Sequence, residues 1–216
     1  MKPFLLVLSS PSGGGKSTIA RHLLEAREDL GYSVSATTRG PRAGEEDGVH
    51  YHFLTPEEFD RREAAGEFVE SASYGGHRYG TLRSEVDRVL ASGRHVVMDI
   101  EVQGARQVRQ AIPDTVSVFV LPPSGSVLVE RLRGRATENE AGLARRLVHA
   151  AEELLAATEY DYVVVNDDLV AAVDAVAAIL EAEGHRTGRT AGLEDRVRTM
   201  SAEVRAARTD VAESSA

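Results

Sequence analysis

Residues 9–18 read Ser-Ser-Pro-Ser-Gly-Gly-Gly-Lys-Ser-Thr and directly follow the apolar run Phe-Leu-Leu-Val-Leu of residues 4–8. The apolar run predicts a buried strand, and the apolar spacing of residues 19–24 predicts one face of a helix. A glycine-rich turn between strand and helix can curl its backbone N–H groups around an anion, and the helix N-terminus adds the positive end of its dipole. Lys16 can then reach the β- and γ-phosphates of a nucleotide, and Ser17 can ligate Mg²⁺.

This stretch departs from the common phosphate-binding pattern at its first position. The pattern has glycine six residues before the lysine, where this chain has Ser10. Ser10 is small, and Pro11 and Gly13 can supply the tight turn, so we still expect a phosphate site. The alternative interpretation is a Gly/Ser connection without a ligand. Gly-Lys-Ser-Thr directly after a buried N-terminal strand favours phosphate binding.

Composition limits the function classes. The 216 residues suffice for one good core with small appended lobes. The net charge of −9 argues against general nucleic-acid binding, which needs a basic field. The lack of cysteine excludes disulfides and thiolate metal sites and is typical of the reducing cytoplasm. The apolar run of residues 4–8 is too short for a secretion signal, and no segment reaches membrane-spanning length, so we expect a cytoplasmic protein without membrane contact.

Strand-like and helix-like segments alternate along most of the chain. Strands are expected at residues 4–8, 32–37, 95–100, 115–121 and 162–165, with helices between them. This alternation predicts an α/β fold in which helices flank a central parallel sheet.

The segment between residues 35 and 81 has a different texture. Residues 49–54 alternate as a half-buried strand does, and Thr55 with Glu58 forms the pattern of a capping box at a helix start. Residues 68–79 predict an antiparallel hairpin around a Gly-Gly turn. We therefore expect a small lobe of mixed strands and helix, inserted into the α/β plan.

The last part of the chain is polar apart from one apolar stripe. Leu193, Val197, Met200 and Val204 recur at spacings of four, three and four residues, which predicts a helix with a narrow apolar face. That face would either pack on the same subunit or form a homodimer. We expect disorder from residue 210 onward.

Two arginines in the inserted segment suggest a second phosphate site. Arg39 and Arg42 lie three residues apart beside a tight turn, and guanidinium groups match phosphate oxygens in pairs. Tyr51 and Tyr79 could donate hydroxyl hydrogen bonds to the same group. Taken alone, this loop fits a solvated, salt-bridged surface better than a phosphate site, because charged loops are common.

The chain resembles the guanylate kinase family of nucleoside monophosphate kinases, in the family's order across nearly all of residues 1–182. The most specific piece is Thr-Thr-Arg-Gly-Pro-Arg-Ala-Gly-Glu at residues 37–45, which non-catalytic relatives also share. The other matching pieces lie at residues 11–17, 68–70, 79–81, 99–105, 122–124, 135–138, 146–147 and 165–167.

This resemblance implies a P-loop kinase core with a helical lid and an inserted GMP-binding lobe. The core would comprise residues 1–34 and 82–184, with the lid at about 125–155. The lobe would be residues 35–81, and residues 185–216 would form an extension. The implied activity is Mg²⁺-dependent phosphoryl transfer from ATP to GMP, and by extension to dGMP, with these small molecules as the substrates.

The resemblance also implies individual roles. The residues implied in catalysis are Lys16, Arg39, Arg42, Arg135 and Arg146. The residues implied in ATP binding are Pro11, Ser12, Gly13, Gly14, Gly15, Lys16, Ser17, Thr18 and Asn166, the last of which could instead cap a helix. The residues implied in GMP binding are Ser35, Arg39, Arg42, Glu45, Tyr51, Glu70, Tyr79, Thr81 and Glu101. Mg²⁺ would be held by Ser17 and, through water, by Asp99.

Elementary chemistry supports Glu70 independently. Guanine presents N1–H and N2–H₂ side by side, and one ionised carboxylate can accept from both, whereas adenine has an acceptor at N1. Two family positions differ here: Glu101 stands where aspartate is more usual, and Ala136 where glycine is. The extra methylene of Glu101 puts its contact with the base in doubt, and Ala136 could stiffen its turn.

Two other functions fit parts of the sequence. One is a non-catalytic module that grips phosphopeptides through Arg39 and Arg42. Such relatives typically lose the phosphate loop, which this chain keeps. The other is a kinase for a different acceptor, such as AMP or a sugar phosphate, against which Glu70 and Ser35 argue.

Overall fold

The computed structural model of the chain describes residues 1–134 and 140–213. The chain forms two compact units: Pro3–Leu180, and a second unit that combines Met1–Lys2 with Glu181–Ala216. Within the described ranges, no helix is both long and apolar enough to cross a membrane.

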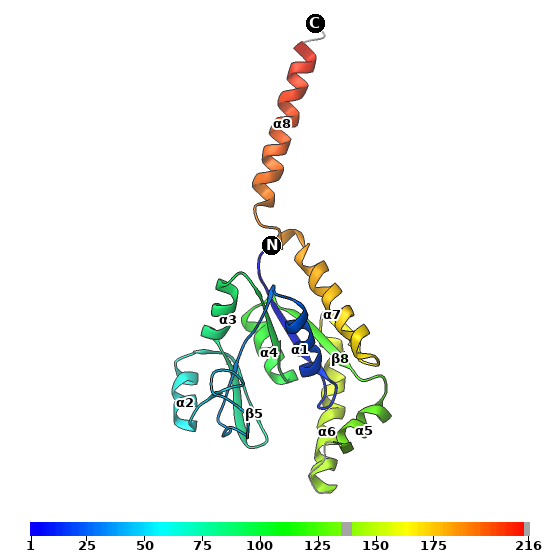
Figure 1. Cartoon of the computed structure of the whole chain (residues 1–216). Coiled ribbons are helices and arrows are strands. Elements are labelled where there is room, and N and C mark those ends of the chain that lie inside the picture. Colours follow the sequence, from blue (N-terminus) through cyan, green and yellow to red (C-terminus); the bar gives the residue numbers. More distant parts are fainter. Residues whose placement is uncertain (135–139, 214–216) are drawn as a thin grey trace. The chain divides into compact units, whose positions relative to one another are not determined.

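A five-stranded parallel sheet forms the centre of the first unit (Figure 1). Its strands, in spatial order, are β2 (Leu30–Tyr32), β7 (His95–Asp99), β1 (Leu5–Ser9), β8 (Val116–Leu121) and β9 (Tyr162–Val165). β1 is buried along its whole length, as its apolar run predicts for a strand covered on both faces. Leu8 pairs with Asp99, so the carboxyl end of β7 lies beside the point where the phosphate loop leaves β1.

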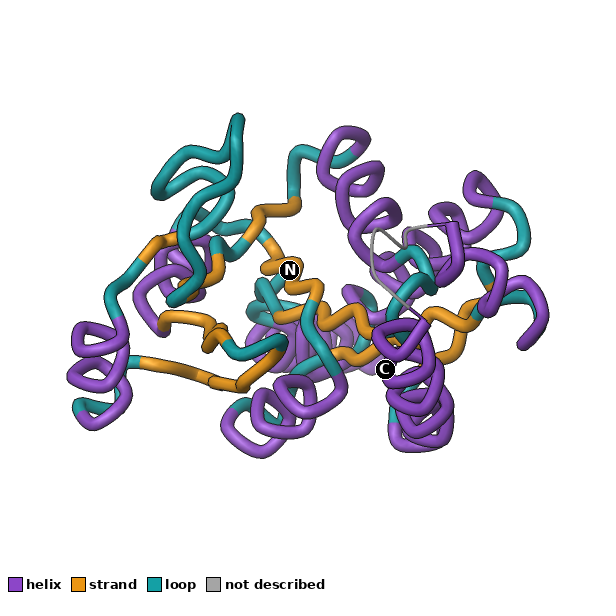
Figure 2. The backbone as a smooth tube through the Cα atoms, turned by 90° about the horizontal axis from the view of Figure 1, so that it is seen from below, coloured by secondary structure: helices purple, strands orange, loops and turns teal. Residues whose placement is uncertain are grey.

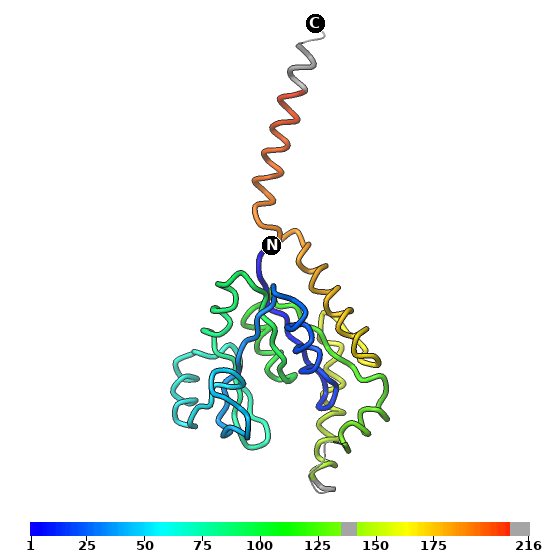
Figure 3. The backbone as a smooth tube through the Cα atoms, viewed as in Figure 1, coloured from blue at the N-terminus to red at the C-terminus, as the bar shows by residue number. Residues whose placement is uncertain are grey.

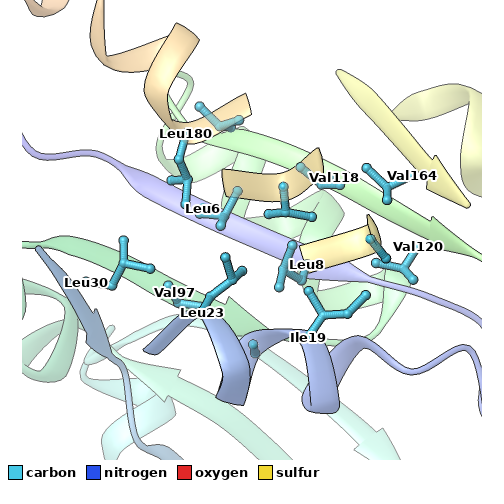
Figure 4. Packing of buried hydrophobic residues seen from close by; sticks show 14 of the residues in the cluster. Leu6, Leu8, Ile19, Leu23, Leu30, Val97, Val118, Val120, Val164 and Leu180 are labelled. Atoms are coloured by element: carbon cyan, nitrogen blue, oxygen red, sulfur yellow. The ribbon is translucent and has the colours of Figure 1, made fainter. Parts of the chain in front are cut away.

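Helices cover both faces of this sheet. Alternate residues of β1 point to opposite sides. Leu6 and Leu8 share a core with α1 (Lys16–Ala26) and α7 (Leu169–Gly184), as Figure 4 shows. Leu5 and Val7 face α3 (Arg83–Ala91) and α4 (Val102–Ala111). The predicted doubly covered α/β sheet is therefore confirmed.

A second, mixed sheet forms a lobe of the same unit. Its order is β4 (His52–Phe53), β3 (Ser35–Thr37), β6 (His77–Leu82) and β5 (Phe68–Tyr74), with α2 (Pro56–Ala64) beside it (Figure 2). β3 pairs in parallel with β4, and the other two pairings are antiparallel. A small core of Ala36, Phe59, Phe68 and Leu82 holds the lobe, with the rings of Phe59 and Phe68 stacked at 4.4 Å.

Two more helices form a separate packed pair. α5 (Gly125–Gly134) and α6 (Glu140–Leu155) meet through Leu128, Leu132 and Ala150, and a short 3₁₀ turn, Ala156–Glu159, leads from α6 to β9. The lid expected at about residues 125–155 coincides with this pair. Arg135 and Ala136, both singled out from the sequence, lie outside the described residues.

Three local expectations were wrong in detail. Residues 32–37 are not one strand, because the chain leaves the central sheet at Tyr32 and enters the lobe's sheet at Ser35. The strand expected at 49–54 shrinks to His52–Phe53, because residues 46–51 turn back on themselves through a Gly48 N–H to Tyr51 carbonyl bond. Thr55 does cap α2 by accepting from the Glu58 N–H at 3.2 Å, but the Glu58 carboxylate pairs with Arg61 and Arg62.

The second unit consists of the end of the chain and its first two residues. Arg189 is buried and ion-paired with Glu183, and its carbonyl accepts from the Lys2 N–H at 2.9 Å. α8 (Leu193–Glu213) confirms the predicted helix, and Val197, Met200 and Val204 on its apolar stripe are exposed. The expectation of disorder from residue 210 was wrong as far as Glu213, and residues 214–216 lie outside the described part. Packing of this stripe on the same subunit or on a second copy stays a prediction.

Candidate active site

One pocket of about 290 Å³ opens between the phosphate loop, the end of β7 and the lobe. Lys16 and Ser17 line it from the start of α1, and Asp99 and Glu101 from the end of β7. The predicted residues that line it from the lobe are Ser35, Arg39, Arg42, Tyr51, Glu70 and Tyr79. The fold therefore brings together side chains that lie more than 80 positions apart in the sequence, from Lys16 to Glu101.

The phosphate loop is shaped by its backbone. Gly13 and Gly15 have φ angles of 87° and 101°, a region that favours glycine, and the Gly14 N–H donates to the Pro11 carbonyl at 2.8 Å. The side-chain amide of Asn166 donates to the Gly14 carbonyl at 2.9 Å and packs so closely that a Cβ on Gly15 would lie 2.3 Å from its nitrogen. Asn166 thus holds the loop from behind.

Ser10 fits the position where glycine is more usual. Its side chain is buried, and its hydroxyl donates to the Pro11 carbonyl at 2.9 Å. The Ser10 side chain also fills the space beside Gly14, since a Cβ added to Gly14 would lie 2.6 Å from the Ser10 Cβ. The turn is therefore made with serine, in contact with a glycine that has no room for a side chain.

Lys16 is paired with a carboxylate of the same pocket. Its Nζ lies 2.8 Å from Oε1 of Glu101. Burial alone would lower the pKa of Lys16, but the Glu101 carboxylate outweighs it and raises that pKa. Burial likewise acts to raise the pKa of Glu101, and the Lys16 charge and hydrogen bonds turn the net shift downward. Both groups are therefore charged, so Lys16 is a cation held at the mouth of the phosphate loop.

Asp99 and Ser17 are the oxygen donors that suit Mg²⁺ here. Both line the pocket, and the Tyr32 hydroxyl donates to Asp99 Oδ1 at 2.7 Å, which holds that carboxylate oxygen. Mg²⁺ usually takes one or two protein oxygens and completes its octahedron with waters and phosphates. A hydroxyl and a carboxylate beside a phosphate loop fit that requirement.

The lobe's arginines are held by one acidic residue. Glu45 accepts two parallel hydrogen bonds from Arg39, at 2.9 Å each, and a third from the Arg42 N–H at 2.7 Å. These bonds lower the pKa of Glu45 to about 2. Arg39 also lies over the Tyr51 ring, 5.3 Å from its centroid. Glu45 is not among the residues that line the pocket, so its place in the geometry is to orient Arg39.

Glu70 projects from β5 into the pocket as a buried acid. The Thr81 hydroxyl on the neighbouring strand donates to Glu70 Oε1 at 2.8 Å. Burial raises the pKa of Glu70 to about 7, against the opposing effect of the Thr81 hydrogen bonds. The carboxyl group is therefore poised to gain charge when a ligand offers it hydrogen-bond donors. Thr81 itself is buried and does not line the pocket.

Some of the other residues expected at an ATP site line a second pocket of about 250 Å³. Its lining consists of Gly13, Gly15, Thr18, Arg131, Asn166, Asp167 and Leu169, whereas Pro11, Ser12 and Gly14 line neither pocket. The cap of α7 is made by Asp168, whose carboxylate accepts the Ala171 N–H at 2.9 Å, so Asn166 is not that cap. Arg146 lies half-buried on α6 and lines neither pocket.

Six residues that line this pocket were not predicted as site residues: Tyr32, Ala72, Tyr74, Gly80, Ile100 and Gly104. Tyr32, which orients Asp99, lay in a predicted strand and gave no signal of its own. Gly104 also lines the pocket. It leaves room for Glu70, because a Cβ added at Gly104 would lie 2.6 Å from Glu70 Oε2. Gly104 does belong to the motif at residues 99–105, and a glycine inside a predicted helix was the signal that could have identified it.

Comparison with known proteins connects this geometry to one family. The guanylate kinase family model matches residues 2–183. The chain is 50% identical over 188 residues to a guanylate kinase of Symbiobacterium thermophilum, covering 87% of this chain and 89% of the relative. It is 48% identical over 200 residues to one of Chelativorans sp., covering 92% of each. The crystal structure of guanylate kinase from Anaplasma phagocytophilum superposes with a TM-score of 0.75 at 36% identity, covering 91% of this chain and 94% of that one.

Proposed function

The chain belongs to the guanylate kinase family, and from that premise we propose that it transfers the γ-phosphoryl group of ATP to the phosphate of GMP, forming ADP and GDP. The observation that supports this most directly is the shared pocket. Lys16 at the phosphate loop faces the same space as Arg39 and Glu70 of the lobe. A donor triphosphate and an acceptor monophosphate can therefore meet there.

On the donor side, we propose that the N–H groups of residues 13–17 surround the ATP phosphates. The start of α1 adds its dipole, and Lys16 adds a full charge. Pro11, Ser12 and Thr18 complete the loop. Asn166 holds it in shape, and Arg135 and Arg146 would approach the phosphates from the lid.

On the acceptor side, we propose that Arg39, Arg42, Tyr51 and Tyr79 bind the GMP phosphate. Arg39 is pre-oriented by its fork with Glu45, which reduces the entropy lost on binding. The base would lie against Ser35, Thr81 and Glu101, with Glu70 accepting from its N1–H and N2–H₂. GMP and dGMP differ only at the 2′ position of the sugar. The proposed contacts are to the phosphate and the base, so dGMP would fit the same pocket as GMP.

Mg²⁺ would be held by the Ser17 hydroxyl and, through water, by the Asp99 carboxylate. When bound it would neutralise charge on the transferred phosphoryl group. Tyr32 keeps Asp99 in place for that role by its hydrogen bond at 2.7 Å.

The proposed chemistry is in-line phosphoryl transfer without a covalent enzyme intermediate. Catalysis comes from positioning and charge neutralisation, so the residues that matter are cations: Lys16, Arg39, Arg42, Arg135 and Arg146. Lys16 must exchange Glu101 for phosphate oxygens, which frees Oε1 of Glu101 to contact the base. Closing the lobe and the lid would expel water and prevent hydrolysis of ATP.

A coupled assay of ADP release tests the proposal. ATP and Mg²⁺ are held constant, and GMP, dGMP, AMP and UMP are compared as acceptors by kcat/KM. We expect GMP and dGMP to be used and AMP and UMP to be rejected, because an adenine N1 lone pair would face the Glu70 carboxylate. Turnover of AMP equal to that of GMP would contradict the assignment of the base pocket. No ADP release with any nucleotide, together with phosphopeptide binding, would replace the enzyme by a binding module.

A further inference from the structure

A glutamate of the lid helix α6 reaches the phosphate loop. Oε2 of Glu153 accepts the backbone N–H of Ser12 at 3.1 Å, across 141 positions of sequence. Figure 3 shows the blue phosphate loop beside the yellow-green tube of α6. The Glu153 side chain thus accepts a hydrogen bond from the backbone of the phosphate loop.

The same carboxyl group also contacts Glu101. The side chains of Glu153 and Glu101 lie close enough to interact, and Oε1 of Glu101 holds Lys16 at 2.8 Å. Oε2 of Glu101 is buried and has no partner unless a proton lies between the two carboxyl groups. Two carboxyl groups can hydrogen-bond only when one of them is neutral and donates.

The two acids have different electrostatic surroundings. Burial and the neighbouring Glu101 raise the pKa of Glu153 to about 7. The Lys16 charge overcomes burial at Glu101 and lowers the pKa of that group. Glu153 accepts from the Ser12 N–H with Oε2, and in its neutral form it can donate to Glu101 with its other oxygen.

We propose that Glu153 is a positioning residue that links the lid helix to the phosphate loop and to the carboxylate beside Lys16. This inference rests on the proposed function. Through the Ser12 N–H, Glu153 sets the distance between α6 and the loop. Arg146 lies seven residues earlier on α6, two turns away on the same side of the helix, so the same contact sets the reach of that arginine toward the ATP phosphates.

The link to Glu101 has a second consequence. When Lys16 turns from Glu101 to phosphate, a carboxylate with one buried oxygen would be left without its cation, which is costly. The hydrogen bond from Glu153 remains and keeps Glu101 paired and in place. Glu153 thereby lowers the free-energy cost of moving the Lys16 ammonium group from Glu101 to the phosphate.

Three variants of the full-length chain test this role, with kcat, the KM for ATP and thermal unfolding measured for each. Glu153→Gln keeps an oxygen for Ser12 and gains an N–H₂ donor for Glu101, so it copies the neutral acid. Glu153→Ala removes both contacts while keeping a good helix former. Glu152→Ala, at the neighbouring exposed glutamate, is the matched control.

We expect Glu153→Gln to stay within about threefold of the unchanged chain in kcat and in the KM for ATP. Glu153→Ala should lose about tenfold in kcat and raise the KM for ATP by a similar factor, the cost of one or two lost hydrogen bonds at a positioned group. Glu152→Ala should match the unchanged chain.

Three outcomes would overturn the proposal. Wild-type kinetics in Glu153→Ala would show that the contact does not matter. Equal impairment in Glu153→Gln and Glu153→Ala would show that a negative charge, and not a neutral bridge, is needed. A lower melting temperature in Glu153→Ala with unchanged kinetics would assign Glu153 to stability alone. Failure of the unchanged chain to phosphorylate GMP would instead refute the proposed function.

Discussion

The phosphate loop and the inserted lobe differ in the groups that they offer to a ligand. The loop uses the backbone N–H groups of contiguous residues and tolerates Ser10 where glycine is more usual. The lobe offers side chains from β3, β5, β6 and the loop between β3 and β4, and two of them are held by a neighbouring side chain: Arg39 by Glu45, and Glu70 by Thr81. Binding by backbone is a local property of sequence, whereas binding by side chains depends on tertiary structure.

The two regions also differ in how they manage buried charge. Lys16 stays charged because Glu101 is 2.8 Å away. Among the described residues Glu70 has the Thr81 hydroxyl and no cation as a partner, and burial raises its pKa to about 7. The donor side therefore presents a ready cation, and the acceptor side presents an acid whose charge depends on pH and on the ligand.

The largest expected effect tests the donor side. Lys16→Met should lower kcat by about 100-fold or more, because a cation at the transferred phosphoryl group is lost. The KM for GMP should change little, since the lobe is untouched. The coupled assay of ADP release measures the activity, and circular dichroism on the same sample checks that the variant is folded. Near-normal turnover in a folded variant would remove Lys16 from its role.

The matching test on the acceptor side is Glu70→Gln. An amide can accept from one of guanine's two donors but faces the other with its own N–H₂. We expect kcat/KM for GMP to fall by about 30- to 100-fold, the cost of hydrogen bonds to a charged group. The KM for ATP should stay within about twofold. Unchanged preference for GMP over AMP would refute the role of Glu70.

A smaller, graded effect should appear with pH. Glu70 must be ionised to accept from guanine, and its pKa in the free protein is raised to about 7. kcat/KM for GMP should therefore rise with pH and level off above about pH 7, and it should fall by about tenfold for each unit of pH below that. The profile of Glu70→Gln isolates this effect, because titration of the substrate phosphate and of Glu153 remains in that variant. Parallel profiles would show that Glu70 is not the titrating group.

The contrast between the two regions explains how much could be predicted from sequence. The strand–loop–helix unit of residues 4–26 and the alternating strands of the central sheet follow from local pattern, because apolar periodicity and glycine turns act over a few residues. Arg39, Arg42 and Glu70 were assigned through a family resemblance, since the sequence around each, taken alone, fits an exposed surface better than a binding site. The resemblance identified the residues but not their partners.

The missed features are all tertiary. Nothing in the sequence near Tyr32 indicates that its hydroxyl meets Asp99, 67 positions later. The break between β2 and β3 is also invisible locally, because residues 32–37 have strand propensity throughout, and only the choice of sheet separates them. In the sequence Glu153 is one of several polar residues of a long predicted helix. Only the structure shows that it lies beside Ser12 and Glu101.

The smallest expected effect concerns the shape of the phosphate loop. A Cβ on Gly14 would lie 2.6 Å from the Ser10 Cβ, so Gly14→Ala should destabilise the fold by about 1–3 kcal/mol through overpacking. Combining it with Ser10→Gly should recover about 1 kcal/mol relative to the sum of the single changes, because the two side chains compete for one space. Urea unfolding of the two single variants and the double variant measures this coupling. Gly40→Ala is the matched control in the lobe, where nothing lies within 4 Å of the added carbon, and it should leave stability unchanged. Strict additivity of the two loop changes would mean that Ser10 and Gly14 do not share that space, and that the loop accommodates its serine by some other adjustment of the backbone.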